Sequence, residues 1–140
     1  MTKLEYTRKE RRKSTGEDFT PIELVNEMLD KLSEDVWQPE KLWVDPAGGN
    51  GNFVVEILKR KLAKGHPPLI ALSTIFGVEL QQDNTDECKE RLLAELPELS
   101  NEDLQKAKDI INHNIVAHNA FTWDFENWKS KDKKSKKLFE

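Results

Sequence analysis

The sequence predicts an α/β fold: a doubly wound parallel sheet, of which the first three strands and their flanking helices are present. Three short apolar runs, residues 42–45, 75–79 and 115–117, have the length and composition of buried strands. Segments with helical spacing of apolar residues separate these runs, and such alternation favours βαβ units. A glycine-rich turn follows the first run directly, at the sheet edge where folds of this class bind ligands.

Length and composition limit the class of protein. A chain of 140 residues with 36% hydrophobic and 34% charged residues suits one modest core. No apolar run approaches the roughly 18 residues that span a bilayer, and the polar, basic N-terminus has no secretory-signal pattern. The single cysteine, Cys88, excludes an internal disulfide and is expected to be a small core residue. We therefore expect a soluble cytoplasmic protein with no membrane partner.

Charge is distributed unevenly along the chain. Residues 1–13 and 129–140 each hold six Lys or Arg and two acids, a net of +4 at each end, whereas residues 14–128 carry −12. The basic ends can contact a phosphate backbone, which makes DNA a candidate partner, but solvated tails are the interpretation we favour. We divide the chain into a basic N-terminal tail (1–14), a ligand-binding domain (15–128) and a Lys-rich C-terminal tail (129–140).

The first helix is predicted over residues 22–33. Thr20 suits the N-cap, Pro21 suits the first helical position, and Glu23 completes a capping box. The first strand, residues 42–45, follows and ends in Asp-Pro and the glycine-rich turn.

The remaining elements continue the alternation of helices and strands. They are a helix over 53–62 closed by Gly65, a strand over 75–79, a helix over 83–96, a helix over 101–111 capped by Ser100, and a strand over 115–117. Because crossovers between parallel strands are right-handed, the residues that follow the strands meet at one edge of the sheet.

The glycine turn, DPAGGNGNF at residues 45–53, allows close approach of a ligand to N–H groups of the following helix; a plain strand–helix turn is the alternative. A P-loop requires a Gly-Lys-Ser/Thr ending, which the turn lacks. A dinucleotide fingerprint aligned on Gly49 and Gly51 places Val54 where a small residue belongs. Asp45, beneath the ligand, would repel a pyrophosphate, whereas S-adenosylmethionine presents a sulfonium and an ammonium. The turn therefore favours S-adenosylmethionine.

A second carboxylate is expected at the same edge of the sheet. Glu79 ends the second strand, one βα unit after the glycine turn, where it can accept hydrogen bonds from both hydroxyls of a ribose. Leu80 would offer an apolar surface to the base. A solvated acid is the alternative for Glu79, and its position after the turn favours the ribose.

Four segments stand in a specific order and spacing: TGEDFTP at 15–21, DPAGGNGNF at 45–53, IFGVE at 75–79 and NIVAHNAF at 114–121. Together they resemble adenine-specific N6 DNA methyltransferases, the type found in type I modification subunits and related restriction–modification enzymes. The glycine motif of that family is DPACGSGNF, and the resemblance runs from about Thr15 to Phe125. It implies a partial class I methyltransferase (Rossmann-like) fold and S-adenosylmethionine as cofactor.

The resemblance also implies roles for individual residues. The Phe-Thr-Pro segment would lie against the methionine moiety, and Asn119 stands where an aspartate usually bonds the adenine amino group of the cofactor; an amide oxygen can still accept that bond. The implied cofactor-binding residues are Phe19, Thr20, Pro21, Asp45, Pro46, Ala47, Gly48, Gly49, Gly51, Asn52, Phe53, Glu79, Leu80, Asn119, Ala120 and Phe121. The three histidines lack metal-ligand spacing, and no metal site is expected.

The catalytic motif of the family, Asp/Asn-Pro-Pro-Tyr/Phe after the fourth strand, has no counterpart in the sequence. HPPL at 66–69 lacks the polar acceptor and the aromatic ring, and LFE at 138–140 resembles the start of the fourth strand. We therefore expect the S-adenosylmethionine-binding portion of a DNA adenine-N6 methyltransferase, truncated before its catalytic motif and without catalytic competence alone. No catalytic residue is expected among the 140.

The sequence leaves two alternative functions open and also predicts a protein partner. A catalytically inactive methyltransferase-like module could act through a partner, or as a regulator or decoy in restriction–modification; a methyl-donor enzyme with another acceptor is the lesser alternative. Without a fourth strand, the first strand would be a sheet edge, which predicts a protein partner or dimer that covers it. The aromatic residues Trp123, Phe125 and Trp128 are expected to pack beside the third strand rather than to stack on bases.

Overall fold

The computed structural model describes residues 2–15 and 19–132, with only the backbone for 13–15. Its elements are α1 (Lys3–Thr15), α2 (Ile22–Asp30), the 3-10 helix η1 (Glu34–Trp37), β1 (Trp43–Asp45), α3 (Asn52–Ala63), α4 (Pro68–Ser73), β2 (Ile75–Glu79), α5 (Gln82–Ala94), α6 (Asn101–Asn114), β3 (Ile115–Ala117), the 3-10 helix η2 (Ala120–Thr122), β4 (Trp123–Asp124) and β5 (Lys129–Ser130). None of the helices in these ranges is long and apolar enough to cross a membrane.

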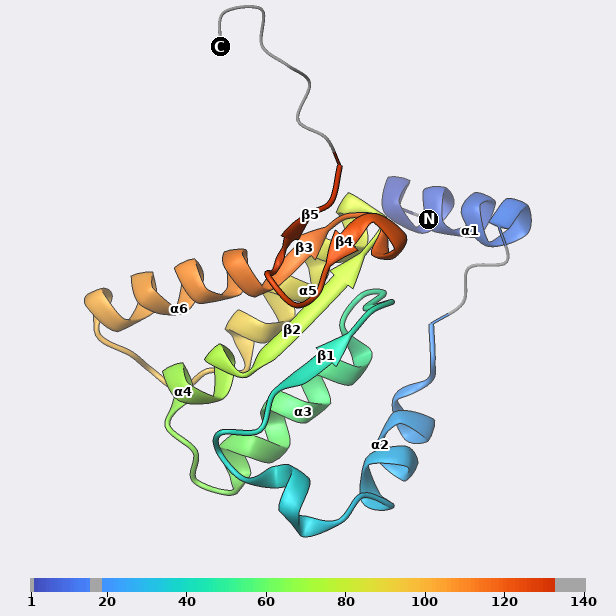
Figure 1. Cartoon of the computed structure of the whole chain (residues 1–140). Coiled ribbons are helices and arrows are strands. Elements are labelled where there is room, and N and C mark those ends of the chain that lie inside the picture. The colour runs from blue at the N-terminus through green and yellow to red at the C-terminus, as the bar shows by residue number, and fades with distance from the viewer. Residues whose placement is uncertain (1, 16–18, 133–140) are drawn as a thin grey trace, which may run out of the picture.

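The centre of the molecule is a three-stranded sheet with the order β1-β2-β3, and both pairings are parallel (Figure 1). The predicted α/β fold with a parallel sheet and flanking helices is therefore confirmed. Strands β2 and β3 have the predicted bounds, and β1 begins at Trp43, one residue later than expected. In the described ranges, β1 has β2 as its one neighbour and lies at the edge of the sheet.

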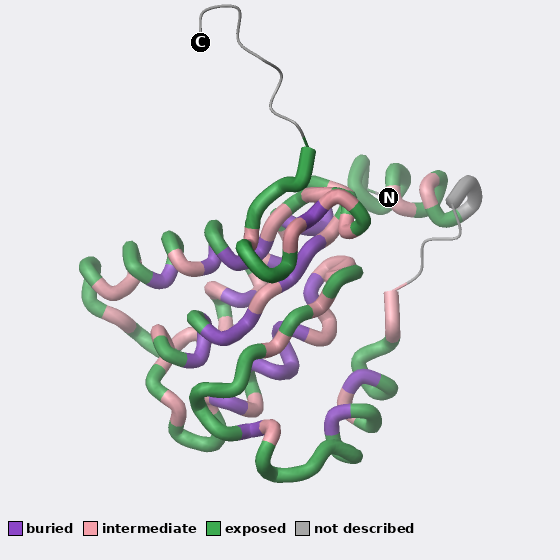
Figure 2. The backbone as a smooth tube through the Cα atoms, viewed as in Figure 1, coloured by how far each residue is buried: buried purple, intermediate pink, exposed green. Residues whose placement is uncertain are grey.

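One face of the sheet carries the hydrophobic core. Helices α3 and α5 cover this face, and α2 packs against α3 beyond β1 (Figure 1). Figure 2 shows the buried residues gathered on the inner sides of these elements. Fully or nearly fully buried members of the core include Val25, Leu29, Val54, Leu58, Ile75, Cys88, Leu92, Ala107 and Ile115. Cys88 is thus a core residue, as expected.

The β4–β5 hairpin lies against the opposite face. The Trp128 ring meets the Phe76 ring edge-on with 4.8 Å between centroids, and its Nε1 donates to the carbonyl of His113 at 2.7 Å. The rings of Trp123 and Phe125 also contact Trp128 edge-on. The expected packing of these aromatic residues beside the third strand is confirmed.

Three local predictions differ from the structure. Helix α1 spans Lys3–Thr15, whereas residues 1–14 were expected to form a tail. The N-cap of α2 is Pro21 with no side-chain hydrogen bond, so the capping box predicted for Thr20 and Glu23 is wrong. Helix α4, from Pro68 to Ser73, was not predicted. By contrast, the Ser100 cap is present: its hydroxyl accepts from the N–H of Asp103 at 3.1 Å.

Candidate functional site

The glycine turn lies at the carboxyl end of β1 and leads into α3. Gly49 and Gly51 have φ of 54° and 98°, a region in which side chains are strained. A Cβ on Gly51 would lie 2.8 Å from the Cys88 sulfur, so the turn packs against α5 more closely than any side chain allows. This contact fixes the path of the backbone beside β2.

Four N–H groups of the turn have acceptors within the protein. They donate from Ala47 to Asp45 Oδ1 (3.0 Å), from Gly48 to the Val78 carbonyl (2.8 Å), from Gly49 to Glu79 Oε1 (3.1 Å) and from Gly51 to the Gly48 carbonyl (3.0 Å). A phosphate-binding turn instead points such donors at its ligand. These four N–H groups already have acceptors, two of them on β2 (Val78 and Glu79), so they are not directed at a ligand. The prediction that N–H groups of the following helix face the ligand concerns other groups and stays a prediction.

The turn lines a pocket of about 250 Å³. Its lining residues are Phe19, Thr20, Asp45, Ala47, Gly48, Gly49, Asn50, Asn52 and Phe53. The Asn50 Oδ1 is buried and has no hydrogen-bond partner. Burial raises the pKa of the Asp45 carboxyl above its ordinary 3.8; the Ala47 N–H opposes this shift and the Glu79 charge adds to it. A carboxylate that is costly to keep charged, beside an unpaired oxygen, suits a cationic ligand.

Glu79 stands half-buried at the end of β2, and its carboxylate accepts three hydrogen bonds. Oε1 accepts from the N–H of Gly49 at 3.1 Å. Oε2 accepts from the N–H of Gln81 at 2.8 Å and from Asn84 Nδ2 at 3.1 Å. Since a carboxylate has about four lone-pair sites, Oε1 can accept one hydroxyl directly. Accepting two hydroxyls of a ribose requires the Gly49 N–H to be released.

The segment that precedes α2 lies over the turn. The Phe19 ring comes within 3.0 Å of the position that a Cβ on Gly49 would take, so a larger residue there would require the ring to shift. Asn52 Nδ2 donates to the Thr20 carbonyl at 2.8 Å, which ties this segment to the start of α3. The structure thus brings 19–20 and the glycine turn, two of the four predicted segments, into contact.

The end of β3 contributes residues on the far side of Glu79. Asn119 Oδ1 accepts from the N–H of Phe121 at 2.9 Å, so the oxygen expected to face an adenine amino group already caps η2. The second lone pair of this oxygen remains available. Phe121 is 93% exposed and Leu80 is 64% exposed, which leaves two apolar surfaces uncovered beside the strand ends. Ala120 is the first residue of η2.

Two of the four remaining predicted residues line the same pocket, and two do not. Pro21 is the N-cap of α2, and Pro46 is exposed in the turn. Asn52 and Phe53 occupy the first turn of α3 and line the pocket.

Three side chains that hold the site in place were not predicted from the sequence. Arg91 donates from Nη1 to the Asn50 carbonyl at 2.9 Å and to Asn52 Oδ1 at 2.8 Å, so α5 supports the turn directly. Asn84 supports Glu79, and Arg8 of α1 in turn contacts Asn84. A buried polar residue five positions after Glu79 is a weak sequence signal for such a role.

A second polar cluster surrounds His118, just after β3. Ser130 Oγ lies 3.3 Å and Asp132 Oδ2 lies 3.2 Å from the same nitrogen, Nε2. A nucleophile–base–acid relay needs its serine and its carboxylate on opposite ring nitrogens. The cluster therefore does not form a catalytic triad. Within the described ranges no group of three or more His, Cys, Asp or Glu side chains could hold a metal ion.

Comparison with known proteins gives one result that covers nearly the whole chain. The family model described as "N-6 DNA Methylase" matches residues 3–137. Neither the curated proteins nor the solved structures give a significant match.

Proposed function

The chain belongs to the N-6 DNA methylase family, and we propose that it is the S-adenosylmethionine-binding portion of a DNA adenine-N6 methyltransferase. One observation carries the choice of ligand: four N–H groups of the glycine turn are already hydrogen-bonded within the protein, and the Asp45 carboxyl lines the pocket beside the turn. A pyrophosphate needs donors, whereas a sulfonium and an ammonium need acceptors. Such a site is better suited to the methyl donor than to a dinucleotide.

The pocket beneath Phe19 suits the methionine part of this cofactor. The Asp45 carboxyl would supply oxygens for its positive charges, and the Phe19 and Phe53 rings line the same pocket. When bound, the cofactor supplies the methyl group that is transferred. Its positive charge would also favour the ionised form of Asp45, which burial disfavours in the free protein.

The adenosine part would lie across the ends of β2 and β3. Glu79 would accept a ribose hydroxyl, and Asn119 would accept the adenine amino group through the second lone pair of its Oδ1. The exposed side chains of Leu80 and Phe121 would enclose the base. Burial of these two apolar groups would contribute to affinity.

The transfer step requires residues outside this chain. The 140 residues contain no Asp/Asn-Pro-Pro-Tyr/Phe segment, which in the proposed reaction accepts the target amino group and stacks on the flipped adenine. We propose that another stretch of polypeptide supplies it and pairs with the edge of β1, and that the basic ends contact DNA.

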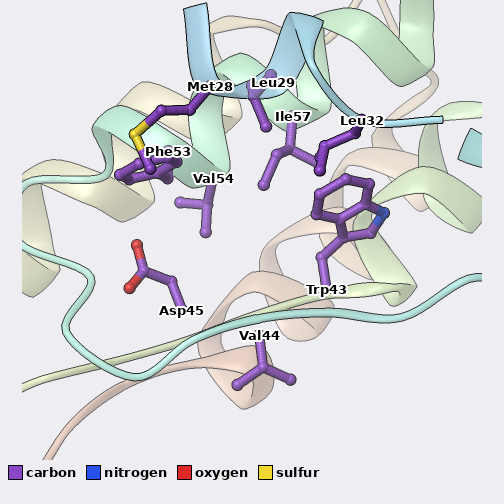
Figure 3. A pocket seen from close by; sticks show the side chains of 9 residues that line it. All are labelled: Met28, Leu29, Leu32, Trp43, Val44, Asp45, Phe53, Val54 and Ile57. Atoms are coloured by element: carbon purple, nitrogen blue, oxygen red, sulfur yellow. The ribbon is translucent and has the colours of Figure 1, made fainter. Parts of the chain in front are cut away.

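The surface beside β1 suits such a neighbour. A cavity of about 300 Å³ lies between α2, α3 and β1 (Figure 3). It is lined by Met28, Leu29, Leu32, Trp43, Val44, Asp45, Phe53, Val54 and Ile57. Asp45 and Phe53 also line the cofactor pocket. A chain that filled this apolar cavity would therefore approach the methyl donor directly.

The second candidate is a catalytically inactive module that binds the cofactor and acts through a partner in restriction–modification. The lack of the catalytic tetrapeptide within the sequence favours it. Transfer of tritiated methyl groups to adenine-containing DNA distinguishes the two: the first proposal predicts transfer when a polypeptide with an Asn-Pro-Pro-Tyr segment is added. Absence of transfer with every such polypeptide, despite binding of the cofactor, would favour the inactive module.

Calorimetric titration with S-adenosylmethionine tests the binding proposal itself. We expect saturable binding to the chain, weaker binding to Glu79→Gln, and unchanged binding to Glu90→Gln, which changes an exposed acid of α5 in the same way. Glutamine keeps one oxygen that can accept from Gln81 and Asn84, while its NH₂ group replaces Oε1, the oxygen that would receive the hydroxyl. No binding to the unmodified chain, or equal binding to Glu79→Gln, would refute the assignment of the site.

A further inference from the structure

Helix α1 is held to the rest of the molecule by polar contacts. Its apolar side chains Leu4 and Tyr6 are 39% and 58% exposed, and none of its described side chains belongs to the hydrophobic core. Arg8 and Arg11 anchor it through ion pairs with Glu87 and Asp83 on α5. Figure 1 shows α1 beyond the carboxyl ends of β1 and β2, on the side where the candidate site lies.

Arg8 contacts one wall of the site through Asn84. Its Nε and Nη2 donate to Asn84 Oδ1 at 3.0 and 2.8 Å, and Nη2 also donates to Glu87 at 2.8 Å. Arg11 adds a hydrogen bond to the same amide oxygen at 3.3 Å and pairs with Asp83. Two guanidinium groups therefore fix which end of the Asn84 amide is the acceptor.

The other end of this amide faces Glu79, the residue proposed above to bind the ribose. Asn84 is fully buried, and its Nδ2 donates to Glu79 Oε2 at 3.1 Å. Because Arg8 and Arg11 hold Oδ1, the NH₂ group is directed at Glu79. This hydrogen bond leaves Oε1 as the oxygen that can receive a hydroxyl.

Arg8 also reaches the opposite wall of the site. Its guanidinium lies over the Phe19 ring, 5.2 Å from the centroid. The Phe19 ring in turn covers Gly49. A cation held over this face of the ring stabilises its position above the turn. One side chain of α1 thus supports both Glu79 and Phe19.

We propose that α1 is a positioning element of the cofactor site, with Arg8 as its positioning residue, so that docking of α1 and binding of S-adenosylmethionine reinforce each other. This inference rests on the proposed function. A helix of 13 residues is only marginally stable by itself in water, so release of α1 from α5 is accessible. Release would free the Asn84 amide and the Phe19 ring, and the coupling must act equally in both directions.

Two double variants with the same change in charge test the proposal. Arg8→Gln with Arg11→Gln removes the anchors, whereas Lys3→Gln with Lys9→Gln changes two exposed lysines of the same helix. We expect the first pair to bind S-adenosylmethionine roughly tenfold more weakly, within the usual range of coupling between sites. The control pair should bind like the unmodified chain. The control pair should melt as the unmodified chain does, and the arginine pair should still unfold in one cooperative transition, because α1 adds no side chain to the core.

Hydrogen exchange of the unmodified chain supplies a readout that needs no variant. We expect the α1 amides to exchange more slowly when S-adenosylmethionine is present. If the unmodified chain binds the cofactor but α1 exchange does not change, or the arginine variant binds equally well, the role of α1 is refuted and the proposed function stands. If the unmodified chain does not bind the cofactor, the proposed function fails and this inference fails with it.

Discussion

Gly51 is the position at which the account of the glycine turn can be tested by a change of one methyl group. The substitution Gly51→Ala places a Cβ at φ 98°, where the nearest atoms are the Sγ, Cβ and Cα of Cys88 at 2.8, 3.1 and 3.2 Å. Because the Cα belongs to the backbone of α5, a rotation of the thiol cannot relieve the contact. Helix α5 or the turn must move.

The expected loss of folding stability in Gly51→Ala has two parts. A side chain in the left-handed region costs roughly 1–2 kcal/mol, and overpacking a dense core costs about 1–3 kcal/mol more. Gly65→Ala is the matched control, because Gly65 has φ 86° but nothing within 4 Å of its Cβ position. The control should lose only the stability that the left-handed backbone conformation costs. Gly51→Ala should therefore be less stable than Gly65→Ala by the cost of overpacking, about 1–3 kcal/mol.

Urea denaturation followed by tryptophan fluorescence measures this difference, with the free energy of unfolding taken by linear extrapolation. Equal destabilisation by the two substitutions would show that the turn does not pack on Cys88 as described. A Gly51→Ala variant more stable than Gly65→Ala would refute the reasoning outright.

Three further outcomes follow from the same structure. Burial raises the folded-state pKa of Asp45 above 3.8. The stability that this group contributes is therefore full below pH 3.8 and is lost as the pH rises through the folded-state pKa. In thermal melts, Asp45→Asn should raise the Tm at neutral pH and flatten its dependence on pH, and the same substitution should weaken S-adenosylmethionine binding. Cys88 is 3% exposed and burial raises its pKa to about 12, so a thiol reagent should label it only as fast as the chain unfolds; rapid labelling under native conditions would contradict its burial. Ser100→Ala should cost about 1 kcal/mol by urea denaturation, since the hydroxyl caps α6; no loss would show that the cap contributes nothing.

The sheet could be predicted because its strands carry local signals. Residues 75–79 and 115–117 are short apolar runs between helical segments, and their bounds in the structure are those predicted. Helix α1 could not be predicted in the same way. Its stabilising partners, such as Asn84 and Glu87, lie 76 and 79 positions away in the chain and are polar, so apolar periodicity gives no signal.

The candidate site shows a similar limit. Glu79 and the glycine turn were predicted at one edge of the sheet, and Gly49 does contact Glu79. The direction of the turn's N–H groups was not predictable, because it depends on the Val78 carbonyl and the Glu79 carboxylate, which belong to another strand. Thr20 was predicted as a cap, yet its carbonyl serves Asn52 instead, a contact across 32 positions.

The most direct test of the central claim is a competition titration of the unmodified chain with S-adenosylmethionine and NAD. A pocket that is lined by the Asp45 carboxyl, beside a turn whose four N–H groups already have acceptors, should bind the cationic methyl donor and leave it bound when the dinucleotide is added. Displacement of the methyl donor by NAD, or binding of NAD alone, would contradict the account.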